Sequence, residues 1–437
     1  MSSGSKLIIH GGHEISGVHV VPGNKNAALP MLTACLLTAA PVTLTNLPII
    51  DDVLTTLELL KAIGVKVALD KAMRTVTLQA DNLVSRELPA ALCAKVRATI
   101  LFAGPMTARL GGVAIAEPGG DVIGRRRIDT HIAGLSALGA AFARRTDGTP
   151  GYTFTAPNGL SGAGIILDEA SVTATENIVM AASVAKGLTT IYNAACEPHV
   201  QDLCAMLRLM GAKISGAGTN LITVEGMPSL HGATARIGAD YIDAGSYMVA
   251  SLVTGGALTV KGVEARDFAI LEKSFAKFGV KWSIEGDTLQ LPGKQKLAVV
   301  TDQGGAIPKI EDGIWPAFPS DLMSILIVLA IHSDGTMLFF EKMFESRLYF
   351  VDHLINMGAH IVQCDPHRIV VIGSSTTKLN GFRVSSPDIR AGIALVIAAL
   401  AANGETEINN AQSIDRGYED IEHRLGELGG QLKRREA

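Results

Sequence analysis

The segment LLKAIGVKVAL, residues 59–69, has a form that recurs along the whole chain. An apolar helix end runs into Gly64, and an alternating run of apolar and polar residues follows it. A glycine just after the last helical position commonly ends a helix, and alternation is typical of a strand with one buried face. The segment therefore predicts a helix, a glycine turn and a strand.

Five further segments share this form. They are LSALGAAFARR (135–145), LRLMGAKISGA (207–217), FAKFGVKWSIE (275–285), LINMGAHIVQC (354–364) and LGELGGQLKRR (425–435). A second pattern precedes each copy, a helix followed by a strand, as in LTAAPVTLTNLP (37–48). The period of about 70 residues is longer than that of common solenoid repeats. We therefore expect six α/β units, three before about residue 235 and three after it, in two domains with a ligand cleft between them.

Composition narrows the class of protein. A length of 437 residues exceeds one ordinary core, and 48% of the residues are hydrophobic. The longest apolar runs, 322–331 and 391–402, are too short to span a bilayer, so we expect buried helices surrounded by sheets. The first residues lack the long apolar stretch of a secretory signal. A net charge of −4 gives no general attraction to nucleic acid.

The five cysteines are widely spaced and odd in number. Such cysteines are typical of buried small side chains in a reducing cytosol, so we expect a cytoplasmic protein. The sequence contains no C-x-x-C pair and no histidine cluster. We therefore expect neither a metal ion nor a cofactor.

A glycine-rich loop, PGGDVIG at residues 118–124, is followed by three arginines, Arg125 to Arg127. Glycines let a backbone approach a ligand closely, and guanidinium groups match phosphate and carboxylate oxygens. Asp121 lies in the middle of this cationic stretch. The loop predicts a mobile anion-binding lid that carries its own proton donor.

The chain resembles the enolpyruvyl transferases, and specifically the UDP-N-acetylglucosamine enolpyruvyl transferase family. The resemblance rests on motifs spread over nearly the whole chain: GNKNAALP (23–30), VRATILFAGP (96–105), PGGDVIG (118–124), ASVTATENIVMAA (170–182), FPSDLM (318–323), SPDIRAG (386–392) and SIDRGYEDIE (413–422). It implies a two-lobed inside-out α/β barrel with three βαβαββ repeats in each lobe. The first lobe is expected at 22–236, with the lid loop at 118–127, and the second at 1–21 plus 237–437.

The resemblance also implies a reaction. The enolpyruvyl group of phosphoenolpyruvate (PEP) passes to a hydroxyl of a uridine nucleotide, and phosphate is released. The default acceptor is UDP-N-acetylglucosamine, which makes this the first committed step of peptidoglycan synthesis. We expect no membrane, nucleic acid or protein partner.

Residue roles follow from the same resemblance. Lys25, Asp121 and Asp321 are expected to be catalytic, with Asp121 as proton donor and Asp321 as general base. Most family members carry a cysteine where this chain has Asp121. The expected substrate-binding residues are Asn26, Arg97, Arg126, Asp129, Ser171, Glu197, Met343, Arg347, Asp388, Arg390 and Arg416.

Each role has a structural alternative. Lys25 can be a solvated loop lysine, and Arg97 can belong to a buried structural ion pair. Asp321 and Asp121 can cap backbone amides, as carboxylates at helix starts often do. Glu197 is about as consistent with a structural role as with a functional one.

Several positions depart from the family pattern, and they lie on the acceptor side. Arg127 replaces a proline and has no counterpart, so it can simply be solvated. Glu169 replaces a lysine near the nucleotide diphosphate, Thr173 replaces a glycine, and Tyr241 and Cys196 replace arginines. These changes keep open a secondary-metabolism enzyme acting on a ribose hydroxyl of UMP in nucleoside antibiotic biosynthesis. A non-catalytic or RNA-end-binding paralogue is the alternative from another class.

Overall fold

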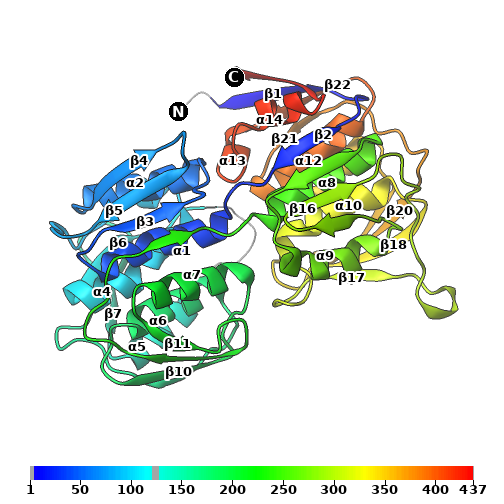
Figure 1. The fold of residues 1–437 in the computed structure, drawn as a ribbon. Coiled ribbons are helices and arrows are strands. Elements are labelled where there is room, and N and C mark those ends of the chain that lie inside the picture. Colours follow the sequence, from blue (N-terminus) through cyan, green and yellow to red (C-terminus); the bar gives the residue numbers. More distant parts are fainter. Residues whose placement is uncertain (1–3, 121–126, 437) are drawn as a thin grey trace. The chain divides into compact units, whose positions relative to one another are not determined.

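The computed structural model describes residues 4–120 and 127–436, which form two compact units. Unit 1 contains residues 4–22 and 239–436, and unit 2 contains residues 23–120 and 127–238. The chain therefore leaves unit 1 after Pro22 and returns to it after Gly238 (Figure 1).

Within the described ranges the strands form six sheets, three in each unit. The strands of unit 2 are β3 (Val42–Thr45), β4 (Lys66–Asp70), β5 (Thr75–Gln79), β6 (Gly112–Ala116), β7 (Ala141–Arg144), β8 (Gly151–Thr155), β9 (Gly164–Ile166), β10 (Leu188–Tyr192), β11 (Lys213–Ser215), β12 (Leu221–Glu225) and β13 (Thr234–Arg236). Those of unit 1 are β1 (Ser5–His10), β2 (Gly17–Val20), β14 (Leu258–Lys261), β15 (Ser283–Glu285), β16 (Thr288–Leu291), β17 (Lys309–Glu311), β18 (Gly335–Phe340), β19 (Ile361–Asp365), β20 (Arg368–Gly373), β21 (Arg383–Ser385), β22 (Glu405–Asn409) and β23 (Gln431–Glu436).

The sheets repeat one topology. A parallel pair is extended by two antiparallel pairings, as in the orders β9-β10-β12-β11 and β17-β18-β20-β19. In the three-stranded sheet β6-β8-β7, the first strand is reduced to one parallel bridge between Glu87 and Ala114. This recurring order is the βαβαββ repeat expected from the sequence.

Two sheets of unit 1 use strands from the beginning of the chain. β2 pairs in parallel with β14, and β1 lies between β22 and β23, antiparallel to both. Figure 1 shows β1 and β2 among elements of the second half of the chain. The first and last segments therefore belong to the same unit.

The predicted glycine turns are confirmed. The six pivotal glycines have positive φ angles: Gly64 (101°), Gly139 (101°), Gly211 (99°), Gly279 (74°), Gly358 (106°) and Gly429 (102°). Each follows an outer helix and precedes a strand. The outer helices are α2 (Asp51–Ala62), α5 (Asp129–Ala137), α7 (Pro198–Leu209), α9 (Ala265–Ala276), α11 (Val351–Asn356) and α14 (Ile421–Glu427).

A second set of helices fills the interior of each unit. In unit 2 it consists of α1 (Lys25–Ala34), the 3-10 helix η2 (Arg97–Phe102) with α4 (Ala103–Leu110), and α6 (Val172–Ala182). In unit 1 it consists of α8 (Tyr241–Thr254), the 3-10 helix η4 (Ser320–Leu322) with α10 (Met323–Ile331), and α12 (Ile389–Ala401). Short α3 (Ala90–Cys93), α13 (Gln412–Asp415), η1 (Cys35–Leu37) and η3 (Gln303–Gly305) complete the described elements.

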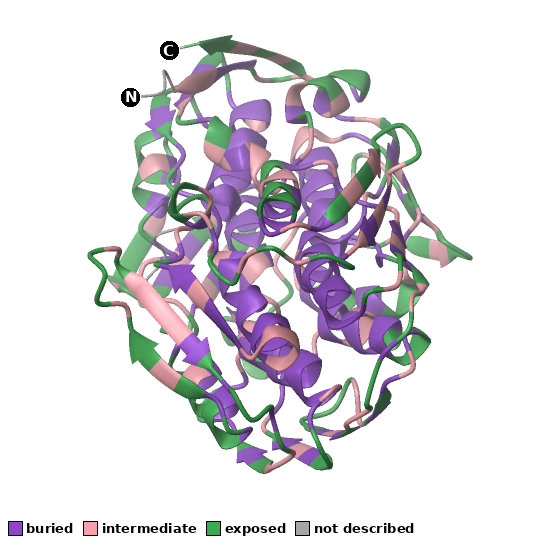
Figure 2. Cartoon of the chain, turned by 90° about the vertical axis from the view of Figure 1, so that its left-hand side faces the viewer, coloured by how far each residue is buried: buried purple, intermediate pink, exposed green. Residues whose placement is uncertain are grey.

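The central helices are buried, as expected for the apolar run 391–402. Every residue of α10 is buried, and α12 is buried from Ile389 to Leu400 (Figure 2). Burial of one Leu or Ile side chain stabilises a fold by about 1.5–3 kcal/mol. An inside-out arrangement, with apolar helices inside and sheets around them, follows from this pattern. None of the described helices has the length and apolar character needed to cross a membrane.

Candidate active site

In unit 2, several predicted site residues stand where the central helices begin. Lys25 is the first residue of α1 and Asn26 the second, and Asn24 caps the helix by accepting a hydrogen bond from Ala27 N at 3.0 Å. The Nζ of Lys25 lies 2.8 Å from Oδ2 of Asp52 on α2, and both side chains are less than a tenth exposed. A buried ammonium requires such a partner. Burial excludes the alternative of a solvated loop lysine.

A buried amide, Asn177 of α6, connects three elements. Its Oδ1 accepts a hydrogen bond from Gly104 N at 2.8 Å, and its Nδ2 donates to Ile100 O at 2.7 Å. These two bonds fix the orientation of the amide, so Nδ2 also donates to Nδ1 of His131 at 2.9 Å. The proton of His131 must then lie on Nε2. Burial, assisted by the charge of Arg97, lowers the pKa of His131 to about 3, so the ring is neutral.

The Nε2 of His131 donates a hydrogen bond to Oγ1 of Thr173 at 3.0 Å. Thr173 lies in the first turn of α6, which Ser171 caps by accepting a hydrogen bond from Ala174 N at 3.4 Å. Arg97 is the first residue of η2. His131 and Asn177 therefore tie together the elements that carry Arg97 and Ser171. Our sequence reasoning missed both residues, although a lone Asn in the apolar run of α6 was a usable signal.

Asp129 and Glu197 also stand at helix starts. Asp129 is the exposed first residue of α5, and its Oδ2 lies 2.6 Å from Nε of Arg127. Glu197 is the N-cap residue of α7 and precedes Pro198. Burial and then the neighbouring charge of Glu197 raise the pKa of Glu176, in α6, well above its usual value. Glu197 therefore lies close enough to Glu176 for its charge to act on that buried carboxyl.

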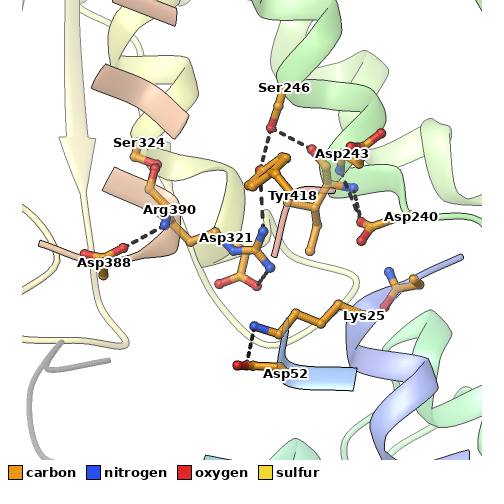
Figure 3. Close-up of polar contacts among 12 residues, drawn as sticks. Lys25, Asp52, Asp240, Asp243, Ser246, Asp321, Ser324, Asp388, Arg390 and Tyr418 are labelled. Carbon is orange, nitrogen blue, oxygen red and sulfur yellow. Dashed lines mark hydrogen bonds and ion pairs between the residues drawn. The ribbon is translucent and has the colours of Figure 1, made fainter. Parts of the chain in front are cut away.

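In unit 1 the predicted residues again gather at the starts of central helices. Asp388 caps α12, because its Oδ1 accepts hydrogen bonds from Arg390 N at 2.7 Å and Ala391 N at 2.9 Å. The Nη2 of Arg390 donates to Oδ2 of Asp321, in η4, at 2.9 Å (Figure 3). Tyr418 lies on the other side of the guanidinium, with its hydroxyl 3.5 Å from Nη1.

Asp321 accepts from a second arginine. The Nη2 of Arg347 lies 3.3 Å from Oδ1 of Asp321, and the Arg347 and Arg390 side chains are both less than a tenth exposed. One carboxylate thus serves two buried guanidinium groups. The N-cap residues of η4 and α10, Pro319 and Leu322, form no side-chain cap hydrogen bond.

A second acidic side chain, that of the buried Glu341, lies beside Arg347. Glu341 Oε2 lies 3.8 Å from Nε of Arg347 and accepts a hydrogen bond from Ser320 Oγ at 2.9 Å. Burial and then the adjacent Asp312 raise the pKa of Glu341 to about 8. Glu341 and Asp312 were not identified from the sequence, since nothing in the chain links two carboxylates that far apart.

The remaining predicted residues are placed as follows. Arg416 follows α13 and is partly buried, and Met343 is 40% exposed. Asp121 and Arg126 lie outside the described residues, so their predicted roles stay predictions. In the part of the chain that the structure describes, no three His, Cys, Asp or Glu side chains form a potential metal site.

Comparison with known proteins agrees with this architecture. The family description of EPSP synthase (3-phosphoshikimate 1-carboxyvinyltransferase) matches residues 9–425. The UDP-N-acetylglucosamine 1-carboxyvinyltransferase of Treponema denticola is 50% identical over 432 residues, 99% of each chain. The enzyme of the same name from Borreliella burgdorferi is 48% identical, over 98% of each chain.

Two solved structures share the fold. The enolpyruvyl transferase NikO from Streptomyces tendae has a TM-score of 0.88 with 23% identity over the whole of both chains. EPSP synthase from Acinetobacter baumannii has a TM-score of 0.77 with 18% identity over 99% of this chain and all of its own. The family match and the extent of identity lead to one conclusion: the chain belongs to the EPSP synthase family of enolpyruvyl (1-carboxyvinyl) transferases.

Proposed function

We propose that this enzyme transfers the enolpyruvyl group of PEP to a hydroxyl of UDP-N-acetylglucosamine and releases phosphate. The observation that carries the proposal is the 44–50% identity, over at least 96% of the chain, to curated relatives that are all named for this reaction. The likeness to NikO concerns the fold, and it gives no support to UMP as the acceptor. We further propose that the enzyme acts in the cytoplasm, because all five cysteines are free.

The reaction needs an acid and a base. A proton added to the methylene carbon of PEP makes the neighbouring carbon electrophilic, and the acceptor oxygen attacks that carbon while its own proton passes to a base. Loss of a methyl proton and of phosphate from the tetrahedral intermediate then regenerates the double bond. We assign the first proton to Asp121 and the base to Asp321, with Arg126 and the loop 118–127 closing over the reactants.

Charge stabilisation is the second requirement. PEP carries a phosphate and a carboxylate, and buried cations at helix starts bind such groups strongly. Lys25 and Arg390 are both more than nine-tenths buried, and a carboxylate of Asp52 or of Asp321, respectively, holds each in place. We assign them to PEP together with Arg416, and we assign Asn26, Arg97, Ser171, Glu197, Met343 and Arg347 to the substrates as well.

The test is phosphate release from PEP by the purified protein with UDP-N-acetylglucosamine, with UMP and without an acceptor. The proposal expects release with the sugar nucleotide alone, and a product whose mass exceeds that of the acceptor by one enolpyruvyl group. Lys25→Ala should abolish release. Lys66→Ala is the matched control, because Lys66 also pairs with an aspartate at 2.7 Å but is 65% exposed. Release with UMP alone would identify a nucleoside-modifying enzyme, and no release with either acceptor would favour a non-catalytic paralogue.

A further inference from the structure

Three carboxylates gather on the predicted acceptor side of unit 2. Asp129 begins α5, and Asp168 and Glu169 lie in the loop before α6. The Oγ1 of Thr130 donates a hydrogen bond to Oε1 of Glu169 at 3.4 Å, which brings this loop against the start of α5. Three negative charges at this place repel a nucleotide phosphate unless a cation offsets them.

Arg127 supplies that cation. Its Nε donates to Oδ2 of Asp129 at 2.6 Å, while its side chain remains 64% exposed. This bond to Asp129, with smaller contributions from the charges of Glu169 and Asp168, raises the pKa of Arg127. Among the described residues, none accepts a hydrogen bond from its two Nη groups. A guanidinium held at Nε presents both Nη groups as a fork, and this fork matches two oxygens of a phosphate.

We propose that Arg127 determines acceptor specificity by binding a phosphate of the nucleotide. Asp129 orients the guanidinium, and the charges of Asp168 and Glu169 penalise any phosphate that Arg127 does not neutralise. This inference rests on the proposed function. It also gives the departures at positions 127 and 169 one explanation, because the added arginine compensates the added glutamate.

The experiment measures KM for UDP-N-acetylglucosamine, KM for PEP and kcat in the wild type and in variants of position 127. Arg127→Ala should raise KM for the nucleotide at least tenfold and leave KM for PEP and kcat within twofold. Arg127→Lys should have a KM for the nucleotide between those of the wild type and Arg127→Ala, because lysine keeps the positive charge but lacks the forked pair of donors. Adding Glu169→Gln to Arg127→Ala should lower KM for the nucleotide several-fold, because one repelling charge is gone.

Lys213→Ala is the matched control, because Lys213 is 57% exposed and pairs with Glu225 at 2.8 Å elsewhere in unit 2. Its kinetic constants should equal those of the wild type. An unchanged KM for the nucleotide in Arg127→Ala, or an equal rise in both KM values, would overturn the inference.

Failure of the proposed function gives a different result, since the wild type would then not turn over UDP-N-acetylglucosamine. Calorimetric titration with UMP tests Arg127 independently of turnover. Weaker binding by Arg127→Ala than by the wild type supports the inference. Equal binding, or no binding to either protein, contradicts it.

Discussion

The guanidinium of Arg390 donates a 2.9 Å hydrogen bond to the carboxylate of Asp321, which precedes it by 69 residues. Arg390 is in the first turn of α12, while Asp321 belongs to η4, which leads into α10. The same carboxylate accepts from Arg347 at 3.3 Å. The group proposed as a base thus accepts hydrogen bonds from two positively charged side chains.

Asp321→Asn should therefore lose both activity and stability. We expect kcat to fall by about 10²- to 10⁴-fold, the usual contribution of a positioned base. The free energy of unfolding should fall by up to about 3 kcal/mol, because two buried arginines lose their anion while Asp321 itself is partly exposed. Phosphate release and urea unfolding measure the two effects. Asp365→Asn is the control, because Asp365 pairs with the exposed Arg368. This variant should change kcat and the free energy of unfolding only slightly.

Glu341 should make stability depend on pH. Burial raises its pKa to about 8 in the folded protein, above the unfolded value near 4.5. The folded state then binds the proton more tightly, so this contribution to stability is full below about pH 4.5 and is lost as pH rises to about 8. Thermal unfolding of Glu341→Gln between pH 5 and 8 should show a shallower decline than the wild type. Glu311→Gln is the control, because Glu311 is partly exposed and its hydrogen bond to Lys309 lowers its pKa; this variant should keep the wild-type decline.

Gly139 and Gly426 form a matched pair of glycines, because a methyl group at either would meet no atom within 4 Å. Gly139 has a φ of 101°, whereas Gly426 lies in α14 and is not among the glycines of positive φ. Gly139→Ala should destabilise by about 1–2 kcal/mol through backbone strain. Gly426→Ala should stabilise by about 0.5–1 kcal/mol through helix propensity. If both substitutions shifted the denaturant midpoint in the same direction, the role of the repeat glycines would be contradicted.

Position 121 should decide sensitivity to epoxides that alkylate the cysteine of other family members. This chain has Asp121 and therefore no thiol there. We expect full activity after exposure to such an epoxide, and Asp121→Cys should become inactivated with one added label. Peptide mass spectrometry distinguishes this label from one at Cys364, the exposed cysteine. A label on residue 121 of the wild type would show that the loop motif is misaligned with the family.

Arg434 should affect PEP binding indirectly, by positioning Arg416. Its Nη1 and Nη2 donate to Asp415 at 2.8 and 2.7 Å, and its Nε and Nη2 donate to Glu422 at 2.6 and 3.0 Å. Asp415 directly precedes Arg416, so Arg434 fixes the segment that carries it. Arg434→Lys cannot form two forked pairs and should raise KM for PEP by up to about 10²-fold, with a smaller effect on kcat.

Arg435→Lys tests whether this effect is specific to position 434. Arg435 is the next residue on β23 and is exposed. Its substitution should leave both kinetic constants unchanged. If the two variants behave alike, Arg434 does not position Arg416.

The repeats were predictable because each is encoded locally. Gly64 and its five counterparts lie between a helical and an alternating pattern, and a positive φ is what a glycine there permits. The first strand of the second repeat is different. It consists of a single bridge at Glu87. No local sequence pattern indicates how many residues of a strand form hydrogen bonds with a neighbouring strand.

The site was predictable only in part. Motifs selected Lys25, Asp321 and Arg390 as candidates, but they did not indicate that Asp52 pairs with Lys25. The neutral state of His131 depends on Asn177, whose amide is oriented by backbone groups of a third element. Such partners are decided by tertiary packing and leave no trace in sequence spacing.

The pairing of β1 and β2 with late strands has a consequence for biosynthesis. β2 can pair only after β14 has been synthesised. β14 lies more than 230 residues downstream, and synthesis of that length takes about 10 to 50 s at typical rates. Unit 2 is complete on the ribosome before that moment, whereas β1 keeps an open edge until β23 emerges. Unpaired strands of this kind are prone to aggregation. A nascent chain that has folded unit 2 therefore still presents its earliest segment as an available substrate for chaperones.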